Sequence, residues 1–459
     1  MKNNFYTIIG LLAMVAASFI PLAASAQEGQ IQYYRPNNKH GINVFETSKK
    51  DTVKFTGLKV KVGGGFTLAY QTLRASNTAT PVIKTVGAAT GNVNAITPLI
   101  DGFNLPMANM NFDIQLADGV RLNLTTYLSS RHHEDTWVKG GYLQIDKMPF
   151  LHSELVDDIM KNVTLVIGQS DIDYGDQHYR RSDGGNTIYN PFVENYIMDE
   201  FATEIGIHAY YKCEKTGLFA MGGMTNGELN ATNIASTKID AKTGRTNYYT
   251  PAFLGKLGFD KQLTTDFRLR LTGSLYSVNS ANSSTLFGGD RTGSRYYNVM
   301  SNPTTAAGTV LSQAVDYKAF SGRFNPGFSQ ENHAYMGNLF FKYKGLEFFG
   351  TIESAKGRTI AETSTRSVKQ YAGDVVYRFP AGTENFWIGY RYNTVSGKIV
   401  GNTTDVTVNR SAGSAGVFMT KNIMMKAEYV TQQYKNYDAT SIFNGGKFNG
   451  FVIEAAISF

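Results

Sequence analysis

The sequence predicts an all-β protein: a transmembrane antiparallel β-barrel of about 16 strands. Polar and apolar residues alternate over many stretches of about ten residues, which is the length of a tilted transmembrane strand. Tight turns join these stretches in pairs, whereas the alternate connections are long and polar. The 29 Phe, 27 Tyr and 46 Gly are typical of strands joined by turns.

Residues 1–26 are predicted to be a secretory signal peptide. Lys2 precedes an apolar run, and Ala24-Ser25-Ala26 supplies the small residues of a cleavage site. A membrane anchor is the alternative, but the run is short and is followed by that site. The residue directly after the cleavage site is Gln27 and not cysteine, so we expect no lipid anchor.

Cys213 is the only cysteine in the chain, so no disulfide framework can form within one molecule. Outside the signal, no stretch reaches the ~20 apolar residues that a spanning helix needs. An exported chain of this length is therefore either periplasmic or a barrel in the cell outer membrane. We expect residues 27–56 to lie in the periplasm or to tuck into the lumen, and residues 57–459 to form the barrel.

The clearest predicted hairpin covers residues 111–128. Phe112, Ile114 and Leu116 share one face, and Asp118-Gly119 lies in the turn. Similar hairpins recur as far as the C-terminus, with turns at 344–345, 380–382 and 420–422. The last strand alternates down to the terminal residue, Phe459.

The connections separate into two groups by length. The long ones are residues 75–103, 172–199, 227–248, 280–332 and 437–446. The opposite connections are tight turns, except that residues 148–162 predict a small helix. Short turns on one side and long loops on the other are typical of an outer-membrane barrel, whereas a soluble sandwich has no reason to segregate loops by length. An even number of strands also leaves both chain ends in the periplasm.

The segment 172–199 is the most charged of these loops, and it is predicted to fold inward as the third external loop. A barrel of this size leaves a lumen too wide for its own side chains to fill, so an inserted segment has to set the size limit. Acidic residues on such a segment, facing basic residues on the wall, would create a transverse field. The candidate constriction residues are Asp171, Asp173, Asp176, Arg180, Arg181, Asp183 and Glu194.

Alternation also predicts which strand residues face the lumen. The basic candidates for the pore wall are Lys59, Lys61, Arg121, Arg268, Arg270, Lys342, Arg378, Arg391 and Lys426. Neighbours such as Val60 and Leu122 would face lipid, where a charge costs roughly 2–4 kcal/mol near the bilayer centre. The net charge is +7. This excess hints at an attraction for anions, although contact with lipopolysaccharide would explain external Lys and Arg equally well.

In residues 175–206, with Asn190-Pro191-Phe192 and Asn195–Asp199, the sequence resembles porins of Bacteroidota outer membranes, a group distantly similar to phosphate-selective porins. The resemblance implies passive diffusion of small hydrophilic solutes and a homotrimer. Residues 172–199 also look like the third external loop of trimeric general porins, which folds into the barrel and narrows the channel. It does not transfer a phosphate site, because the lysines of such a site cannot be matched here. We expect lipid and lipopolysaccharide as neighbours and no nucleic-acid partner.

Three alternatives remain open. An enzyme in a barrel is not favoured, because no G-x-S-x-G or H-E-x-x-H motif occurs. We therefore expect no catalytic residue, cofactor or metal, and we interpret His132-His133 before Glu134-Asp135 as an exposed polar loop rather than a metal site. A plugged receptor would need a plug domain longer than residues 27–56. An adhesin or structural barrel acting through external loops such as 280–332 cannot be separated from a pore by sequence.

Overall fold

The computed structural model describes residues 30–86, 89–104, 106–128, 136–182, 185–228, 238–246, 248–281, 283–289, 294–301, 322–402 and 404–459. The predicted signal peptide, the loop 131–135 and Asp183 lie outside these residues.

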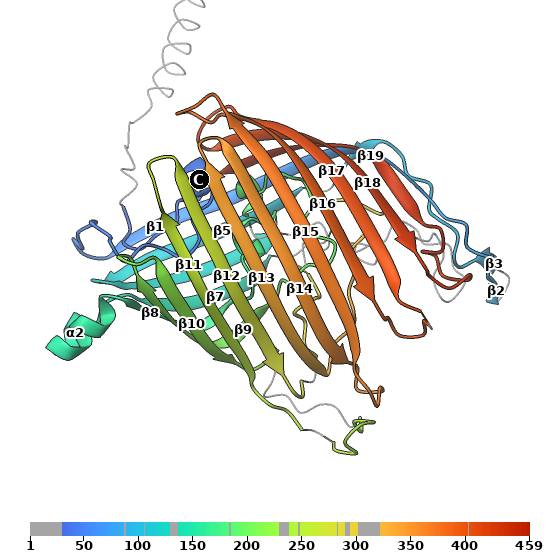
Figure 1. The fold of residues 1–459 in the computed structure, drawn as a ribbon, viewed down its shortest axis with the longest axis horizontal. Helices are drawn as coiled ribbons and strands as arrows, with labels where there is room; N and C mark the ends of the chain where they lie inside the picture. Colours follow the sequence, from blue (N-terminus) through green and yellow to red (C-terminus); the bar gives the residue numbers. More distant parts are fainter. Residues whose placement is uncertain are drawn as a thin grey trace, which may run out of the picture.

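One antiparallel sheet dominates the fold and contains β1 and every strand from β5 to β19 (Figure 1). Their bounds are β1 Lys59–Ser76, β5 Met107–Ala117, β6 Val120–Leu128, β7 Trp137–Ile145, β8 Val163–Asp171, β9 Thr203–Cys213, β10 Leu218–Thr225, β11 Ala252–Gln262, β12 Phe267–Val278, β13 Glu331–Tyr343, β14 Leu346–Arg358, β15 Arg366–Phe379, β16 Phe386–Gly397, β17 Val406–Phe418, β18 Ile423–Lys435 and β19 Lys447–Ser458.

The sheet closes on itself through β1. This strand pairs with β5 on one side, with Val60 opposite Ile114, and with β19 on the other, with Tyr70 opposite Ile453. All other neighbours are consecutive, so the described residues form a barrel of 16 long strands. The predicted strand number and the antiparallel closure are therefore confirmed.

Close backbone approach explains one glycine run near this seam. The backbone N–H of Gly64 donates to the carbonyl of Phe459, and the N–H of Phe459 donates back, both at 3.0 Å. A Cβ atom on Gly63 would lie 2.9 Å from the same Phe459 carbonyl oxygen. The terminal residue therefore docks on β1 only where that strand has no side chains.

The barrel is apolar outside and polar inside. Along β11 and β12, Phe253, Leu257 and Leu271 are exposed on the outer face, while their neighbours Lys256 and Arg270 are buried within the barrel. Closure leaves no unpaired strand edge, which is the condition for crossing lipid with strands, and the apolar exterior matches a bilayer. The chain is an outer-membrane β-barrel.

The connections differ between the two ends of the barrel. The turns at 118–119, 214–217, 263–266 and 344–345 are tight. The helix α2 (Glu154–Met160), preceded by the 3₁₀ turn η2 (Pro149–Leu151), lies between β7 and β8 at this end, as the sequence predicted. The hairpin of β2 (Ile83–Val86) and β3 (Ala89–Asn92) lies at the opposite end (Figure 1). The short strand β4 (Gly102–Phe103) joins the barrel beside β1.

Within the described ranges, no helix has both the length and the apolar character needed to cross a membrane.

Candidate functional site: the lumen and its inserted segments

The connection between β8 and β9, residues 172–202, packs against side chains on the inner face of the barrel. Nearly all of its described residues are buried, and it contains two 3₁₀ turns, η3 (Gln177–Tyr179) and η4 (Thr187–Tyr189). Its two ends are held together where the backbone N–H of Ile172 donates to the carbonyl of Ala202 at 3.0 Å. We call residues 172–202 the inner segment.

Charges hold the first half of the inner segment to β11 and β12. Asp176 is fully buried and receives both Nε and Nη2 of Arg270 at 2.8 Å, together with the hydroxyl of Thr272 at 2.8 Å. Lys256 lies between Asp176, at 3.3 Å, and Asp173. Two buried carboxylates on the segment are thus matched by two buried cations on the wall, which is the condition for burying charge without a large penalty.

Side chains of the wall hold the second half of the inner segment, mainly by hydrogen bonds to its backbone. The Trp387 indole N–H donates to the carbonyl of Pro191 at 3.1 Å, and Glu428 accepts the N–H of Val193 at 2.8 Å. Gln370 accepts the N–H of Met198 at 3.1 Å. Strand partners are absent here, so these side chains satisfy backbone groups that would otherwise be buried without partners.

A second external connection, between β12 and β13, covers the inner segment. Glu194 accepts from the Ser294 hydroxyl and the Arg295 N–H, both at 2.6 Å. Arg323 contacts Glu194 at 3.1 Å and Asp199 at 2.8 Å. Apolar residues of both connections join one buried cluster with the inner faces of β10 to β19. The described parts of residues 279–330 therefore help to fill this side of the barrel.

The N-terminal segment, residues 30–56, crosses the end of the barrel that carries the tight turns. Gln32 donates to Asp118 in the first turn at 2.8 Å, and Asn43 donates to Glu347 on β14 at 2.6 Å. Glu46 forms a two-pronged ion pair with Arg270, with oxygen to nitrogen distances of 2.6 and 2.8 Å. Phe45 packs edge-on against Phe340 and is almost fully buried.

The N-terminal segment then returns to the opposite wall. Lys49 contacts Asp146 at 3.1 Å, and Ser48 donates to Glu214 at 2.8 Å. Although partial burial opposes its ionisation, Lys212 and the hydrogen bond from Ser48 lower the pKa of Glu214 below its ordinary value. These contacts make the segment a strap across the mouth.

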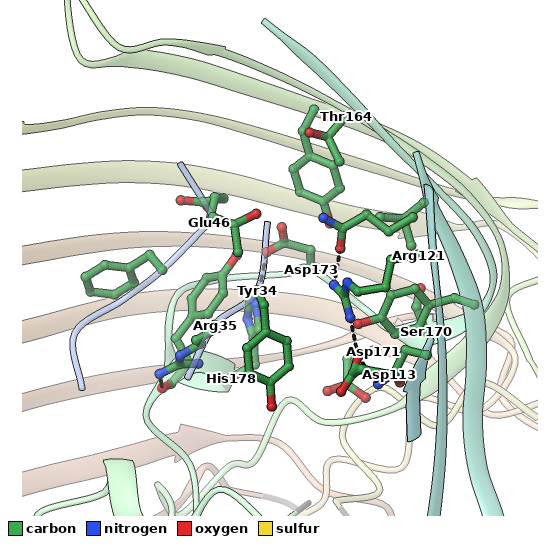
Figure 2. A pocket seen from close by; sticks show the side chains of 18 of the residues that line it. Tyr34, Arg35, Glu46, Asp113, Arg121, Thr164, Ser170, Asp171, Asp173 and His178 are labelled. Atoms are coloured by element: carbon green, nitrogen blue, oxygen red, sulfur yellow. Dashed lines mark hydrogen bonds and ion pairs between the residues drawn. The ribbon is translucent and has the colours of Figure 1, made fainter. Parts of the chain in front are cut away.

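A cavity of about 340 Å³ remains between the strap, the inner segment and the wall formed by β5 to β10 (Figure 2). It follows the wall from Thr164, near the tight turns, to Lys139 and Ser170 farther along the strands. Its lining combines charged, amide, hydroxyl and aromatic side chains. On the wall, Arg121 contacts Asp113 and donates to Gln144 at 2.6 Å.

A second hollow of about 510 Å³ lies at the mouth beside the turns of β11 to β16. Basic side chains dominate its lining, including Lys39, Arg268, Lys342 and Arg378. Three of them are engaged: Arg268 pairs with Asp260 at 2.7 Å, Lys342 with Glu384 at 2.6 Å and Arg378 with Glu347 at 2.9 Å.

The structure brings most of the predicted constriction residues into the barrel. Asp171 ends β8 at the cavity, and Asp173, Asp176 and Glu194 make the contacts described above. Arg180 donates to Asn43 of the strap at 3.0 Å, and Arg181 contacts Asp199 at 2.9 Å. Their ion pairs join the inner segment to the wall and to its own chain, and the hydrogen bond from Arg180 to Asn43 joins it to the strap.

The predicted basic wall residues point inward but have different neighbours. Of the wall candidates, Arg121 lines the cavity along β5 to β10, and Arg268, Lys342 and Arg378 line the second hollow. Lys59 and Lys61 contact the strap, at the Gln30 carbonyl and the Tyr34 ring. Arg270, Arg391 and Lys426 hold the strap or the inner segment: Arg391 donates to the Glu194 carbonyl at 2.7 Å and Lys426 to the Asn190 carbonyl at 2.9 Å. Most of this set thus anchors inserted chain rather than facing open water.

Sequence reasoning missed three groups that the structure places in the lumen. Lys256 stands at an inward position of a strand whose neighbours Phe253 and Leu257 face outward, so the same alternation could have found it. Glu46 and Phe45 lie in a segment without periodicity, and no local signal marks them. Among the described residues, no cluster of His, Cys, Asp and Glu could hold a metal ion.

Comparisons with known proteins give similar barrels but no matching family. No protein-family model matches the chain, and no curated protein matches it. Among solved structures, the anion-selective porin of Comamonas acidovorans is 8% identical and aligns over 88% of this chain and 100% of its own, with a TM-score of 0.49. The outer-membrane channel DcaP of Acinetobacter baumannii is 11% identical, with 88% and 99% covered and a TM-score of 0.49. Salmonella typhi OmpF, solved with daunomycin, is 10% identical, with 88% and 98% covered and a TM-score of 0.46.

Proposed function

We propose that this chain is a porin, a water-filled channel through which small hydrophilic solutes and ions diffuse passively across the outer membrane. The observation that carries the proposal is the polar cavity along β5 to β10, which persists although two inserted connections occupy the other side of the lumen. A purely structural barrel would be expected to have its interior filled to close packing, without such a cavity. We propose that the inner segment is the constriction and that the chain has no catalytic activity.

The basic net charge of +7 supports a preference for anions. We expect this preference to be weak, because three basic residues of the lining, Arg121, Lys49 and Lys212, lie beside Asp113, Asp146 and Glu214. The homotrimer, the contact with lipopolysaccharide and the origin in Bacteroidota stay predictions that rest on the resemblance.

Single-channel recording tests the proposed function directly. The folded protein would be inserted into a planar lipid bilayer, and the reversal potential would be measured in a salt gradient. Stable current steps are expected, with a reversal potential that indicates a slight excess of anion flow. Absence of steps from verified folded protein would contradict the porin proposal and leave an adhesin or structural barrel.

Replacing Arg180 and Arg181 together by alanine is expected to change conductance or ion preference. Both side chains are buried; Arg180 joins the inner segment to the strap at Asn43, and Arg181 holds Asp199. The double variant removes two positive charges beside the constriction and loosens its fixation. Single-channel current and reversal potential measure the effect.

A matched control keeps the same number and type of substitutions. Arg74→Ala with Arg245→Ala removes two exposed arginines that lie outside the lumen. This control should conduct like the unaltered protein. Equal conductance and selectivity in both double variants would count against a constriction at the inner segment.

A further inference from the structure

We propose that the cavity along β5 to β10 is a binding site for an uncharged polyhydroxylated solute, a mono- or disaccharide, on its way through the barrel. The inference rests on the proposed function, since it names the solute class that the channel would favour. Three properties of the lining support it: paired charge, fixed hydrogen-bonding groups and tyrosine rings from three different parts of the chain.

Several charged groups of the lining are engaged with partners of opposite charge, and Arg35 donates to the carbonyls of Gly41 and Tyr179. Arg121 contacts Asp113, Lys49 contacts Asp146 at 3.1 Å, and Glu46 is held by Arg270. A site for a free anion needs cations whose charge the protein leaves unbalanced, and a cation site needs the reverse. The solute that gains most from this lining therefore carries hydroxyl groups and no net charge.

Hydrogen bonds fix the amide and hydroxyl groups of the wall in place. Asn123 donates to Asp113 at 3.0 Å, and Thr125 donates to Asn111 at 2.9 Å. A carboxylate has about four acceptor positions and an amide oxygen has two, so capacity to bind solute hydroxyls remains in this network. Groups held in advance lose little conformational freedom when the solute arrives.

Aromatic rings supply surfaces for the C–H faces of a sugar ring. Tyr34 comes from the strap and Tyr210 from the wall strand β9, and both line the cavity. Tyr189 of the inner segment also borders it, with Arg35 3.9 Å from the centre of its ring. Tyrosine combines a large apolar ring with a polar tip, which suits a solute that is apolar on its faces and polar at its edge. At about 340 Å³ the cavity is at the lower end of the range of small-ligand pockets, which is room for one or two sugar rings.

The test combines channel recording with a matched set of probes. Maltose, triethylene glycol (uncharged, with few hydroxyls) and glucuronate (charged) would be added to the unaltered full chain in a planar bilayer. Binding predicts that maltose reduces the ion current in a saturable manner. Triethylene glycol should give only a small, linear reduction, and glucuronate should be weaker than maltose.

Two variants assign the effect to this cavity. Tyr34→Ala removes a ring from the strap, and the maltose concentration for half-maximal block should rise by about tenfold. Tyr335→Ala is the matched control, because this tyrosine is exposed on the lipid side of β13, and block should be unchanged. Asp113→Asn leaves Arg121 without its carboxylate, and glucuronate should then block better than it blocks the unaltered channel.

The outcomes separate the site from the channel. Three results would overturn the saccharide site and leave the porin proposal intact, provided that the current is stable. The block by maltose could be linear, it could equal the block by triethylene glycol, or glucuronate could block more strongly than maltose. If no current appears, the porin proposal fails by itself. Calorimetric titration of maltose into the barrel, in a detergent without a sugar headgroup, then decides the site: Tyr34-dependent binding supports it, and no binding overturns it.

Discussion

Asp176→Ala is expected to destabilise the barrel and to raise its conductance. The buried carboxylate receives three nitrogens from Arg270 and Lys256 and the hydroxyl of Thr272. Removing one partner of a buried ion pair costs about 3–5 kcal/mol, because the remaining charge is left without compensation. Glu46 still contacts Arg270, so we expect a loss of about 3 kcal/mol in the free energy of unfolding.

The effect on conductance follows from where Asp176 lies. It is the principal charged anchor of the first half of the inner segment, whose neighbours Gly175 and Asp173 contact β12 and β11. Once this anchor is lost, the segment can shift, and water reaches more of the lumen. Urea unfolding in detergent measures stability, and single-channel current measures the opening.

Two further variants make this result specific. Asp176→Asn keeps the size of the side chain but removes its charge, and it should lose nearly as much stability as the alanine variant. Asp266→Ala removes an exposed aspartate in a tight turn and should cost less than about 1 kcal/mol. If Asp176→Ala has the same free energy of unfolding and the same conductance as the unaltered protein, this network does not anchor the inner segment.

Deletion of the strap, residues 30–56, is expected to enlarge the conductance by about twofold or more. The strap joins opposite walls, at Glu347 and at Asp146, and its Phe45 and Glu46 fill space beside Arg270. Without it, the mouth at the end with the tight turns would be narrowed only by the inner segment. The current steps of the deleted and the complete protein provide the comparison.

Because the deletion could also impair folding, a smaller change accompanies it. Phe45→Ala with Glu46→Gln keeps the strap but removes a buried ring and one charge of the Arg270 cluster. It should raise the conductance to an intermediate value. Lys54→Ala, on an exposed part of the strap, is the control. A folded deletion variant with the conductance of the complete protein would show that the strap does not limit flow.

Several elements were predictable because strand geometry repeats every two residues. Alternation at Phe112, Ile114 and Leu116, or at Arg268 and Arg270, distinguishes the lipid face from the lumen face before any contact is known. The turn at Lys344-Gly345 and the small helix at 154–160 were likewise predictable from local residue types. The charge density of residues 171–200 also marked the segment as unusual.

The role of each charge within that segment could not be predicted. The sequence predicts that Glu194 faces basic residues of the wall across the constriction, yet it accepts hydrogen bonds from Ser294 and Arg295, about a hundred residues away in the chain. Arg391 and Lys426 were expected to line a passage, yet both bind backbone carbonyls of the inner segment. The residues that form contacts between inserted connections do not recur at a fixed interval in the sequence, because these connections have no regular backbone geometry.

The sequence by itself determined the barrel, an approximate strand number of 16 with 14 and 18 as alternatives, and which side of each strand meets lipid. These follow from a local rule, since successive strand residues point to opposite faces and a charge facing lipid is costly. Only the tertiary structure decided that the strap crosses the mouth, that two long connections occupy one side of the lumen and that the cavity along β5 to β10 remains. This arrangement depends on ion pairs such as Asp176 with Arg270 and Glu46 with Arg270. Closure of the barrel brings these partners together, and their spacing along the chain does not predict that they meet.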